Sequence, residues 1–537
     1  MNKRILIASL VAMTMIFGCT KDQITWVESG QGQDDGQGHG QDDENGDKDD
    51  INTVAFDRTV YVTFSTGTAS VIGTTDSFAV TINGNGVTIV NHSKDKVRYE
   101  LSGATTDGFF KVYSRRKQAV VLNAVSLANP NGAAINIQGP QDSLSKGKRT
   151  FVLLNGTSSL SDGTNYTGTI SGEDEKGVIF SEGELIFSGN GTLNVTARGK
   201  SGIVSDEYVK FRGGTVNVNM TSAAKVISGD TLKPACIKGK EGFYLMDGTL
   251  TLSSSGNGAK GISGDSIAVF SGGIANVTVT GSNFGSSSGG GNPPRPGQQS
   301  SSSGVSAKGI KFDGNITFSG SNVSVSCSSH EAIESKGTIT VTGGIVYGTS
   351  TADDAINSSG DMTITGGFVG AYSTKNDALD ANGNMYIRGG VVYSVSTAGS
   401  PEVSLDANTE GGKKLYVEGG TLIVIGGLES GAQLNQSCYQ ASSVSANTWY
   451  SISVGADTYA FKTPTFSTSG GGYNPGGGSR TPTLVVSGST QPTVKSGVSV
   501  SGGTEYFNST FNCGGSYSGG SNVSLSSYSG GGGGFPF

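Results

Sequence analysis

The stretch from residue 331 to residue 420 repeats one pattern four times. In each copy a short, mostly acidic phrase precedes a glycine pair: Glu331-Ala-Ile-Glu334 with Gly343-Gly344, Asp354-Ala-Ile-Asn357 with Gly366-Gly367, Asp377-Ala-Leu-Asp380 with Gly389-Gly390, and Val403-Ser-Leu-Asp406 with Gly419-Gly420. Corresponding residues of the first three copies lie 23 positions apart. A fixed period of this length is typical of proteins built from stacked structural repeats.

The same pattern, without the acidic residues, extends back to about residue 177. Each copy begins with an aliphatic anchor, and these anchors are Val178, Ile203, Ile237, Ile262, Ile310, Ile333, Ile356, Leu379 and Leu405. The 87 glycines and the 15% of charged residues favour short strands joined by turns. Three short β runs per repeat without helical spacing predict an all-β fold, a parallel β-helix solenoid of roughly ten rungs. A leucine-rich repeat would show helical arcs, and a propeller blade would need about 40 residues.

The flanking regions predict additional parts. An open solenoid end exposes unpaired strand groups and needs a cap. The predicted division is a cap with the first irregular rungs over 53–170, the β-helix over 171–428 with a disordered 281–304 loop, a β cap or small β domain over 429–530, and a tail over 531–537.

Residues 1–18 resemble a bacterial lipoprotein signal peptide. Lys3 and Arg4 precede an apolar run over 5–17, and Gly18-Cys19 follows it as in a lipobox. We therefore expect lipidation of Cys19 and an outer membrane lipoprotein exposed at the surface of a Bacteroidetes-like bacterium. The alternative is a plain signal peptide or membrane anchor. The apolar run is shorter than the roughly 20 residues that a spanning helix requires.

Residues 19–52 predict a disordered acidic tether. Ten Asp or Glu stand against two Lys between residues 21 and 50, with almost no apolar residue among them. This segment accounts for most of the formal net charge of −7, so the remainder of the chain is nearly neutral. A neutral body argues against nucleic acid as a partner.

Four cysteines follow Cys19, at positions 236, 327, 438 and 513. None lies in a CxxC pair or beside a histidine cluster, which argues against zinc. Four cysteines in an exported protein allow three disulfide pairings, but three of the four fall in different parts of the repeat. Buried free thiols are the preferred expectation.

The acidic residues predict a metal site. In a parallel stack, residues at one register form a column spaced about 4.8 Å apart. One column would hold Glu331, Asp354 and Asp377, and a second would hold Glu334, Asn357, Asp380 and Asp406. Like charges at that spacing repel, and Ca²⁺ would neutralise them through 6–8 oxygen ligands at about 2.3–2.6 Å. Asp353 and turn carbonyls near residues 358–360 and 381–383 would complete the shell.

Two other interpretations of these columns remain open. Lys308 and Lys311 occupy the same columns one repeat earlier, so they could pair only with Glu331 and Glu334, and the other Lys and Arg residues are not well placed. A solvated acidic corner that binds nothing specific is the alternative to calcium. Lys260 also stands in these columns, which indicates that the fold does not require the carboxylates.

Tyrosines near the glycine pairs predict a sugar-binding face. They are Tyr347, Tyr372, Tyr386 and Tyr393, with Tyr416 in the column of Tyr386. Aromatic rings stack on sugars, although Tyr is also an ordinary strand residue. Catalytic signals are poor: no catalytic motif is present, His330 is expected to be a corner residue, and Arg388 is the nearest candidate for a lyase base.

Several motifs resemble the carbohydrate-binding-domain proteins among secreted bacterial parallel β-helices. They are Leu154-Asn-Gly-Thr157, Leu160-Ser-Asp-Gly163, Asp353-Asp-Ala-Ile-Asn357, Asp377-Ala-Leu-Asp-Ala-Asn-Gly383 and Gly419-Gly-Thr-Leu422. The likeness runs from about Val60 to Thr483, and the family includes a clostridial calcium-containing binder of acidic plant polysaccharide. The resemblance implies calcium at Asp353, Asp354, Asn357, Asp377 and Asp380, and binding without cleavage. The chain departs from the family pattern at Glu331 and Glu334 and at Val403-Ser404.

Three functions follow as hypotheses. The first is a monomeric, non-catalytic surface lipoprotein that binds polysaccharide, including uronate chains, through a calcium-stabilised β-helix, with the lipid anchor as its only membrane contact. The second is a calcium-dependent enzyme of the polysaccharide lyase type. The third is an adhesin or structural spacer without glycan affinity.

Overall fold

The computed structural model describes residues 48–139, 149–167, 173–227, 229–285, 304–399, 401–441, 444–466 and 483–530. The predicted signal peptide, the tether up to residue 47, most of the 281–304 loop and the tail over 531–537 lie outside these residues. Within them the protein is all-β, and the one helical element is a short 3-10 turn, η1 (Ile51–Thr53). None of the described segments forms a helix long and apolar enough to cross a membrane.

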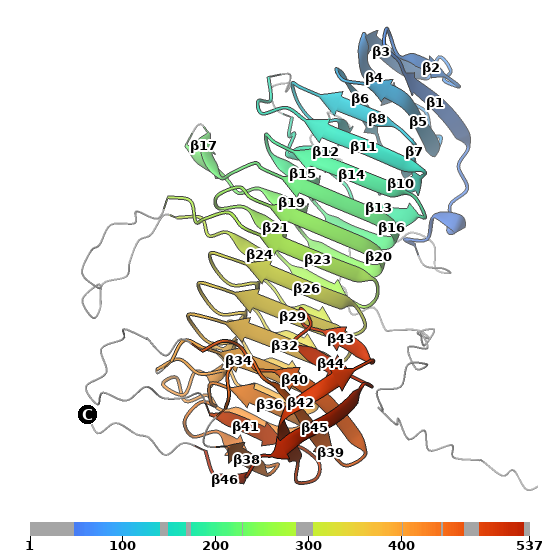
Figure 1. The fold of residues 1–537 in the computed structure, drawn as a ribbon. Coiled ribbons are helices and arrows are strands. Elements are labelled where there is room, and N and C mark those ends of the chain that lie inside the picture. The colour runs from blue at the N-terminus through green and yellow to red at the C-terminus, as the bar shows by residue number, and fades with distance from the viewer. Residues whose placement is uncertain are drawn as a thin grey trace, which may run out of the picture. The chain divides into compact units, whose positions relative to one another are not determined.

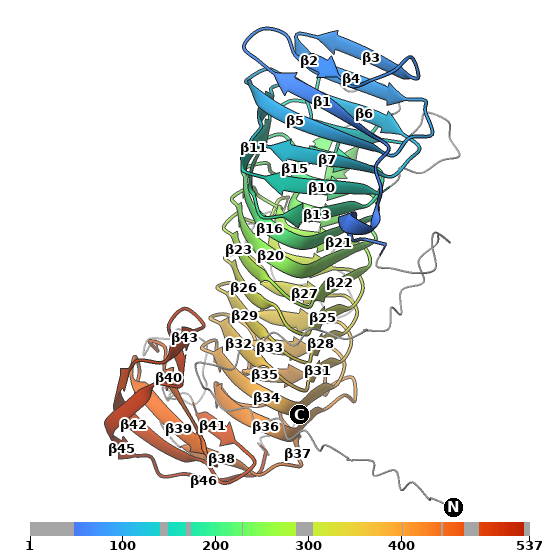
Figure 2. The ribbon, with the colours of Figure 1, turned by 90° about the vertical axis from the view of Figure 1, so that its right-hand side faces the viewer.

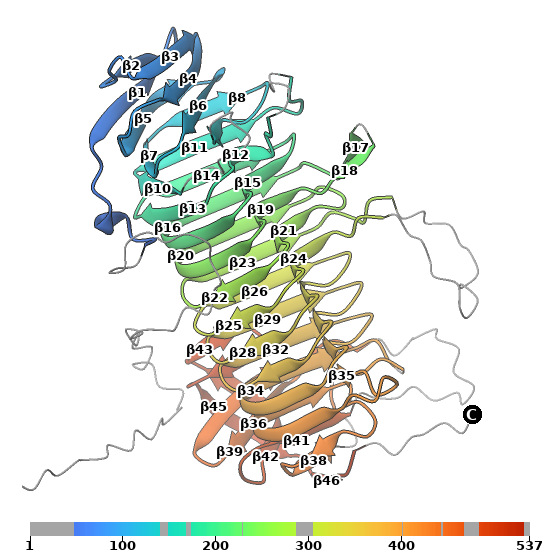
Figure 3. The same cartoon turned by 180° about the vertical axis from the view of Figure 1, so that it is seen from behind.

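A sheet of 13 strands forms one side of the stack and is seen from behind in Figure 3. β3 and β4 form an antiparallel hairpin at its N-terminal end, and every later strand pairs in parallel with its neighbours. The strands are β3 (Phe78–Asn83), β4 (Asn85–Asn91), β6 (Gly108–Ser114), β9 (Ile135–Gln138), β12 (Gly177–Ser181), β15 (Ser201–Ser205), β19 (Ala235–Gly239), β21 (Lys260–Gly264), β24 (Lys308–Phe312), β27 (Ile333–Ser335), β30 (Ile356–Ser358), β33 (Leu379–Ala381) and β35 (Leu405–Ala407).

A second sheet of 25 strands covers the rest of the stack (Figure 1). Its strands are β1 (Arg58–Phe64), β2 (Ser70–Ile72), β5 (Val97–Thr105), β7 (Gln118–Asn123), β8 (Ser126–Asn129), β10 (Thr150–Asn155), β11 (Thr157–Asp162), β13 (Leu185–Gly189), β14 (Thr192–Ala197), β16 (Tyr208–Met220), β20 (Gly242–Ser254), β22 (Ile267–Phe270), β23 (Ile274–Val279), β25 (Ile316–Phe318), β26 (Asn322–Cys327), β28 (Ile339–Val341), β29 (Ile345–Ser350), β31 (Met362–Ile364), β32 (Phe368–Ser373), β34 (Met385–Ser396), β36 (Leu415–Ile425), β37 (Gln433–Leu434), β38 (Cys438–Ala441), β41 (Leu484–Ser487) and β46 (Ser526–Tyr528). A hairpin of β17 (Lys225–Ile227) and β18 (Asp230–Leu232) stands apart from both sheets.

One repeat of the stack contributes one strand to the 13-stranded sheet and two rows to the larger sheet. β30, β31 and β32 form such a repeat, and each pairs in parallel with its counterpart one repeat earlier and one repeat later. Figure 2 shows the rows lying one above another. The parallel, all-β arrangement predicted from the 23-residue period is therefore confirmed. The anchor column is also as predicted except at its start, where Ile179 and not Val178 pairs with Ile203.

The interior of the stack is a continuous apolar core. Its most regular part is a ladder of phenylalanines over successive repeats, with ring centroids 4.8 Å apart for Phe187 and Phe211, 5.3 Å for Phe243 and Phe270, and 4.9 Å for Phe270 and Phe318. All five rings are buried. Because the buried side chains of one repeat pack on those of the next, the core contributes to stability along the whole stack and not only in the acidic repeats.

The glycine pairs form the corners between the two rows of the larger sheet. Gly367 has a φ of +78°, and a Cβ there would lie 2.7 Å from the carbonyl oxygen of Gly344 in the preceding repeat. Only glycine allows both the left-handed backbone and this close approach.

Replacing Gly367 with alanine is therefore expected to destabilise the stack by about 3 kcal/mol. Gly427 is the matched control, because it has a φ of +101° but a Cβ added there would meet no atom within 4 Å. Gly427→Ala should cost about 1 kcal/mol, through the backbone alone. Urea unfolding of both variants measures the difference, and equal losses would show that repeat-to-repeat crowding does not select glycine at the corner.

A smaller β unit lies near the C-terminal end of the chain, over residues 445–466 and 490–524. It is one antiparallel sheet in the order β43-β44-β40-β39-β42-β45. Its strands are β39 (Trp449–Val454), β40 (Asp457–Lys462), β42 (Thr493–Ser501), β43 (Thr504–Tyr506), β44 (Phe511–Cys513) and β45 (Ser516–Asn522). β38, β41 and β46 belong instead to the stack, where β41 pairs antiparallel with both β36 and β38.

The described cysteines are buried. Cys236, Cys327 and Cys438 are free thiols, as predicted. Cys513 is buried in the smaller β unit.

Candidate functional site

The two predicted acidic columns exist, and both lie on the 13-stranded sheet. The second column runs through Asn136, Phe180, Val204, Lys238, Ser263, Lys311, Glu334, Asn357, Asp380 and Asp406. In the first column, Lys260 pairs with Lys308, and Asp354 Oδ1 accepts a hydrogen bond from the backbone N–H of Asp377 at 3.1 Å. Acidic residues thus begin at β27 and continue to β35, and the strand immediately before them, β24, carries Lys308 and Lys311 in the two columns.

A ladder of serines holds the loops that carry the acids. Ser350 Oγ donates to the His330 carbonyl oxygen at 2.8 Å and accepts from the Asp353 N–H at 3.0 Å. Ser373 Oγ donates to the Asp353 carbonyl at 2.8 Å, and Ser396 Oγ repeats the contact on the Asn376 carbonyl at 2.8 Å. These three serines recur every 23 residues, a signal that sequence reasoning missed. The ladder fixes each acidic loop against the one before it, so the carboxylates stay in register.

The carboxylates of the first acidic repeat are neutralised by cations of the protein itself. Lys308 Nζ lies 2.9 Å from Glu331 Oε2 and 2.6 Å from Glu334 Oε2. Lys336 Nζ contacts the other oxygen of Glu334 at 2.5 Å. The expectation that lysines are poorly placed is wrong here, because Lys336 also reaches the column. Lys311 pairs with Asp313 instead of a glutamate.

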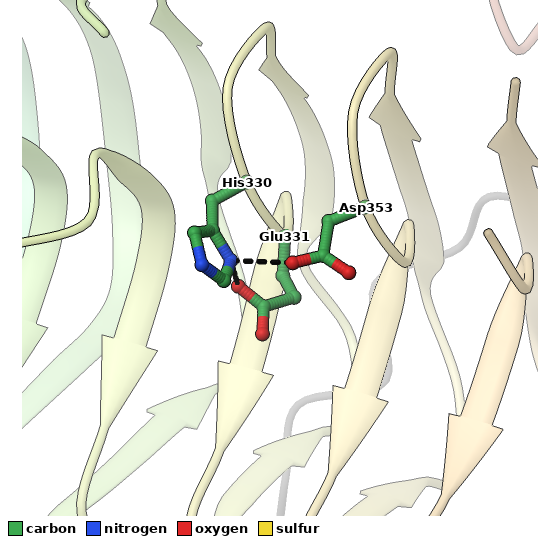
Figure 4. A group of neighbouring side chains, drawn as sticks. All are labelled: His330, Glu331 and Asp353. Atoms are coloured by element: carbon green, nitrogen blue, oxygen red, sulfur yellow. Dashed lines mark hydrogen bonds and ion pairs between the residues drawn. The ribbon is translucent and has the colours of Figure 1, made fainter. Parts of the chain in front are cut away.

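His330 completes this neutralised repeat. Figure 4 shows that one nitrogen of its ring, Nδ1, faces both Glu331 and Asp353; this nitrogen is bonded to Glu331 and lies 2.7 Å from Asp353 Oδ2. Burial would lower the pKa of His330, but the hydrogen bonds to Asp353 and Glu331 outweigh it and raise the pKa to about 9. Burial likewise opposes the charge of Glu334, yet Lys308 and Lys336 hold its pKa below the ordinary value. His330, Glu331 and Asp353 are close enough to share a metal ion, but the histidine prefers its proton.

The next repeats hold buried carboxylates without such partners. Asp354 and Asp377 are 5% and 8% exposed. In the part of the chain that the structure describes, no ion pair reaches Asp354, Asp377, Asp380 or Asp406. A solvated acidic corner is therefore wrong as a description of Asp354 and Asp377, whose side chains are buried and accept hydrogen bonds from backbone N–H groups.

Hydrogen bonds organise these carboxylates but do not neutralise them. Asn357 Nδ2 donates to Asp354 Oδ2 at 3.0 Å and to Asp380 Oδ2 at 2.5 Å. Asp377 Oδ1 accepts from the Val403 N–H at 2.6 Å. Asn357 is thus the residue that ties the two columns together.

The pKa values of this group are raised. Burial, followed by the charge of Asp380, raises the pKa of Asp354 to about 8. Burial also raises the pKa of Asp377 to about 7, against the Val403 hydrogen bond and with the charge of Glu402. The pKa values of Asp380 and Asp406 are raised chiefly by burial as well. At neutral pH a proton or a cation would offset the cost of the buried charges of Asp354 and Asp377.

The second column extends one repeat beyond the predicted set. Leu428 bridges to Leu405, which places Glu429 after Asp406, and a side-chain hydrogen bond between Asp406 and Glu429 contributes to the raised pKa of Asp406. Thr409 Oγ1 donates to Glu429 Oε1 at 3.1 Å. The signal was present in the sequence, since Leu428-Glu429 follows Leu405-Asp406 by the same 23 residues.

The donor set of these repeats consists of carboxylate oxygens and the side-chain oxygen of Asn357. Oxygen-only sets suit hard divalent cations, and Ca²⁺ in particular accepts several carboxylates with flexible geometry. Asp354, Asp377, Asp380 and Asp406 therefore suit the predicted ion by residue type, whereas Asn357 turns its Nδ2 toward Asp354 and Asp380. Among the described residues, the group of acidic, His or Cys side chains whose ligand atoms lie within 4.8 Å of one another is His330, Glu331 and Asp353. Glu331, Glu334 and Asp353 fit it less well, because their oxygens already contact Lys308, Lys336 and His330.

The tyrosines do not form the open face that was predicted. Tyr347 and Tyr393 are buried, with 6% and 4% exposure, and Tyr372 is half-buried. Tyr386 and Tyr416 do share a column, and their rings stack with centroids 5.0 Å apart. Tyr372, Tyr386 and Tyr416 are thus the members of this set that are partly open to solvent.

Arg388 is occupied on the larger sheet, away from the 13-stranded sheet that carries the acids. Its Nε lies 2.7 Å from Glu418 Oε2, and its guanidinium lies 4.3 Å from the centre of the Tyr386 ring. The Tyr386 ring is thus approached by both Tyr416 and Arg388, which leaves less of it for a sugar. Nothing in these contacts gives Arg388 the position of a base beside the acidic columns.

Fold and site together define an all-β repeat protein whose parallel strands carry an in-phase acidic face. Within that class, the chain belongs to the family of carbohydrate-binding domain-containing proteins, whose model matches residues 83–355, about half of the chain. Most of the acidic columns lie beyond the matched residues.

Comparisons with individual proteins add little. No curated protein matches the sequence. A solved structure of a polysaccharide lyase-like protein from C. thermocellum, a gadolinium derivative, is 16% identical, with a TM-score of 0.30 over 62% of this chain and 94% of that chain. At that TM-score the likeness supports no functional comparison.

Proposed function

We propose that this protein is a non-catalytic, monomeric cell-surface lipoprotein whose stack, a parallel β-helix, binds polysaccharide with the help of calcium. Membership of a carbohydrate-binding domain family supports polysaccharide as the partner in general. The lipobox-like Cys19 supports an anchor in the outer membrane, from which the acidic tether would hold the stack away from the bilayer.

The observation that carries the calcium part is a group of four carboxylates, of which Asp354 and Asp377 are buried and Asp380 and Asp406 are half-buried. Their pKa values are raised and no described cation pairs with them. Calcium would allow all of them to ionise at neutral pH. Ions held there could also accept uronate carboxylates of a glycan as additional oxygen ligands, which favours acidic polysaccharide.

Calcium-dependent glycan binding is the expected result of a direct test. Isothermal titration with polygalacturonate should show binding in calcium that is lost in EGTA. The double variant Asp354→Asn/Asp380→Asn should bind at least about tenfold more weakly. Asp265→Asn is the matched control, because Asp265 is an exposed acid that pairs only loosely, at 3.7 Å, with Lys238 on the same sheet.

The same samples separate the alternatives. A glycan array without any bound ligand in the presence of calcium would contradict the proposal and favour a spacer. Ultraviolet absorbance that rises during incubation with polygalacturonate would instead indicate a lyase, since β-elimination leaves an unsaturated uronate.

A further inference from the structure

We propose that the ammonium group of Lys308 takes the place of a divalent ion in the first acidic repeat and so fixes where the cation-binding column begins. This inference rests on the proposed function, since it concerns the same acidic columns. It assigns to one lysine the role of limiting the number of ions that the protein binds.

The position of Lys308 is the first observation. Its Nζ bridges one carboxylate from each column, at 2.9 Å from Glu331 Oε2 and 2.6 Å from Glu334 Oε2. Glu331 and Glu334 stand at the registers that Asp354 and Asn357 occupy one repeat later. The ammonium therefore lies between the columns, where a cation shared by both would have to lie.

Burial is the second observation. Lys308 is 8% exposed and Glu334 is 1% exposed, so this contact is an interior one and is little screened by water. A surface lysine would exchange readily with ions from solution, whereas this ammonium is held in place by its two carboxylates.

The change of charge along the columns is the third observation. Lys260 precedes Lys308 in the first column, and Asp354 and Asp377 follow Glu331. The glutamates thus lie at the boundary between lysines and aspartates. Lys336 and His330 neutralise the carboxylate charge that Lys308 leaves in the first acidic repeat, so no charge remains in that repeat for a metal ion to balance.

Replacing Lys308 with methionine tests the inference. The variant keeps the length of the side chain but leaves Glu331 and Glu334 without their shared cation. It is expected to bind one Ca²⁺ more than the wild-type protein, as measured by elemental analysis after gel filtration in calcium. Calcium should also raise the melting temperature of the variant by more than it raises that of the wild type. Lys311→Met is the matched control, because Lys311 lies on the same strand, pairs with Asp313 and should leave the ion count unchanged.

Glu334→Gln provides a second arm that does not depend on the folding of the methionine variant. If Lys308 already fills the first repeat, the loss of the Glu334 charge should leave the number of bound ions equal to that of the wild type. A lost ion in Glu334→Gln, or an unchanged ion count in a folded Lys308→Met, overturns the inference. Failure of the proposed function looks different, because the wild type itself would then bind no ion.

Discussion

Chelation with EGTA is expected to lower the melting temperature of the protein by about 6 °C. Each ion that is present at 100 times its Kd stabilises the folded state by about 2.7 kcal/mol, and two such ions give about 5 kcal/mol. For a unit of roughly 400 residues each kcal/mol shifts the melting temperature by about 1.2 °C. The loss arises because Asp354, Asp377, Asp380 and Asp406 would face one another without a cation.

The control for this prediction is a variant that cannot hold the ions. Asp354→Asn/Asp380→Asn removes two of the buried charges, so its melting temperature should be nearly the same in calcium and in EGTA. Differential scanning calorimetry with magnesium as a second control distinguishes calcium from a general effect of divalent ions. A wild-type protein that melts at one temperature in both buffers would rule out calcium as a stabilising ligand.

The second large effect is expected in the calcium-free protein, whose free energy of unfolding should fall as the pH rises. This is the reverse of the usual effect of ionising Asp and Glu residues. The pKa values of Asp354 and Asp377 are raised to about 8 and about 7 in the folded state. The folded state therefore binds more protons than the unfolded chain between about pH 4 and pH 8, and stability falls as pH rises through this window. His330, whose pKa is raised to about 9, acts in the same direction at its upper end.

The size of this effect follows from Asp354 and Asp377, the two most buried aspartates of the acidic columns. A pKa unit corresponds to about 1.4 kcal/mol, so the loss between pH 5 and pH 8 is on the order of 5 kcal/mol. Urea unfolding in EGTA should show it, and saturating calcium should remove most of it, since the ions hold the carboxylates ionised. Stability in EGTA that stays level or rises from pH 5 to pH 8 would mean that the aspartates already have partners.

Most of the fold could be predicted because the sequence pattern that specifies it recurs at a regular spacing. The anchors from Ile203 to Leu405 recur with the strands, and stacked repeats translate a period in sequence directly into a register in space. The exception at Val178, where Ile179 is the true anchor, arose because two neighbouring aliphatic residues satisfy the pattern equally well. A side chain's direction, inward or outward, is decided by one residue of register.

The acidic columns could be predicted for the same reason, but their partners could not. Lys308 lies 26 residues before Glu334, and whether its flexible side chain reaches the glutamates depends on rotamers that the sequence does not specify. The burial of Tyr347 and Tyr393 could not be predicted either, since an outward register does not imply exposure. Sequence reasoning missed Glu429, although it lies 23 residues after Asp406, because the regular pattern of the earlier repeats ends after residue 425.

A crystal structure of the protein grown in calcium at pH 8 would show whether ions bind to the acidic columns and in which repeats they lie. We expect anomalous difference density between the carboxylates of Asp354, Asp377 and Asp380, with Ca–O distances of about 2.3–2.6 Å, and no such density between Glu331 and Glu334. The absence of density from all of the acidic repeats at saturating calcium would contradict the proposed calcium site.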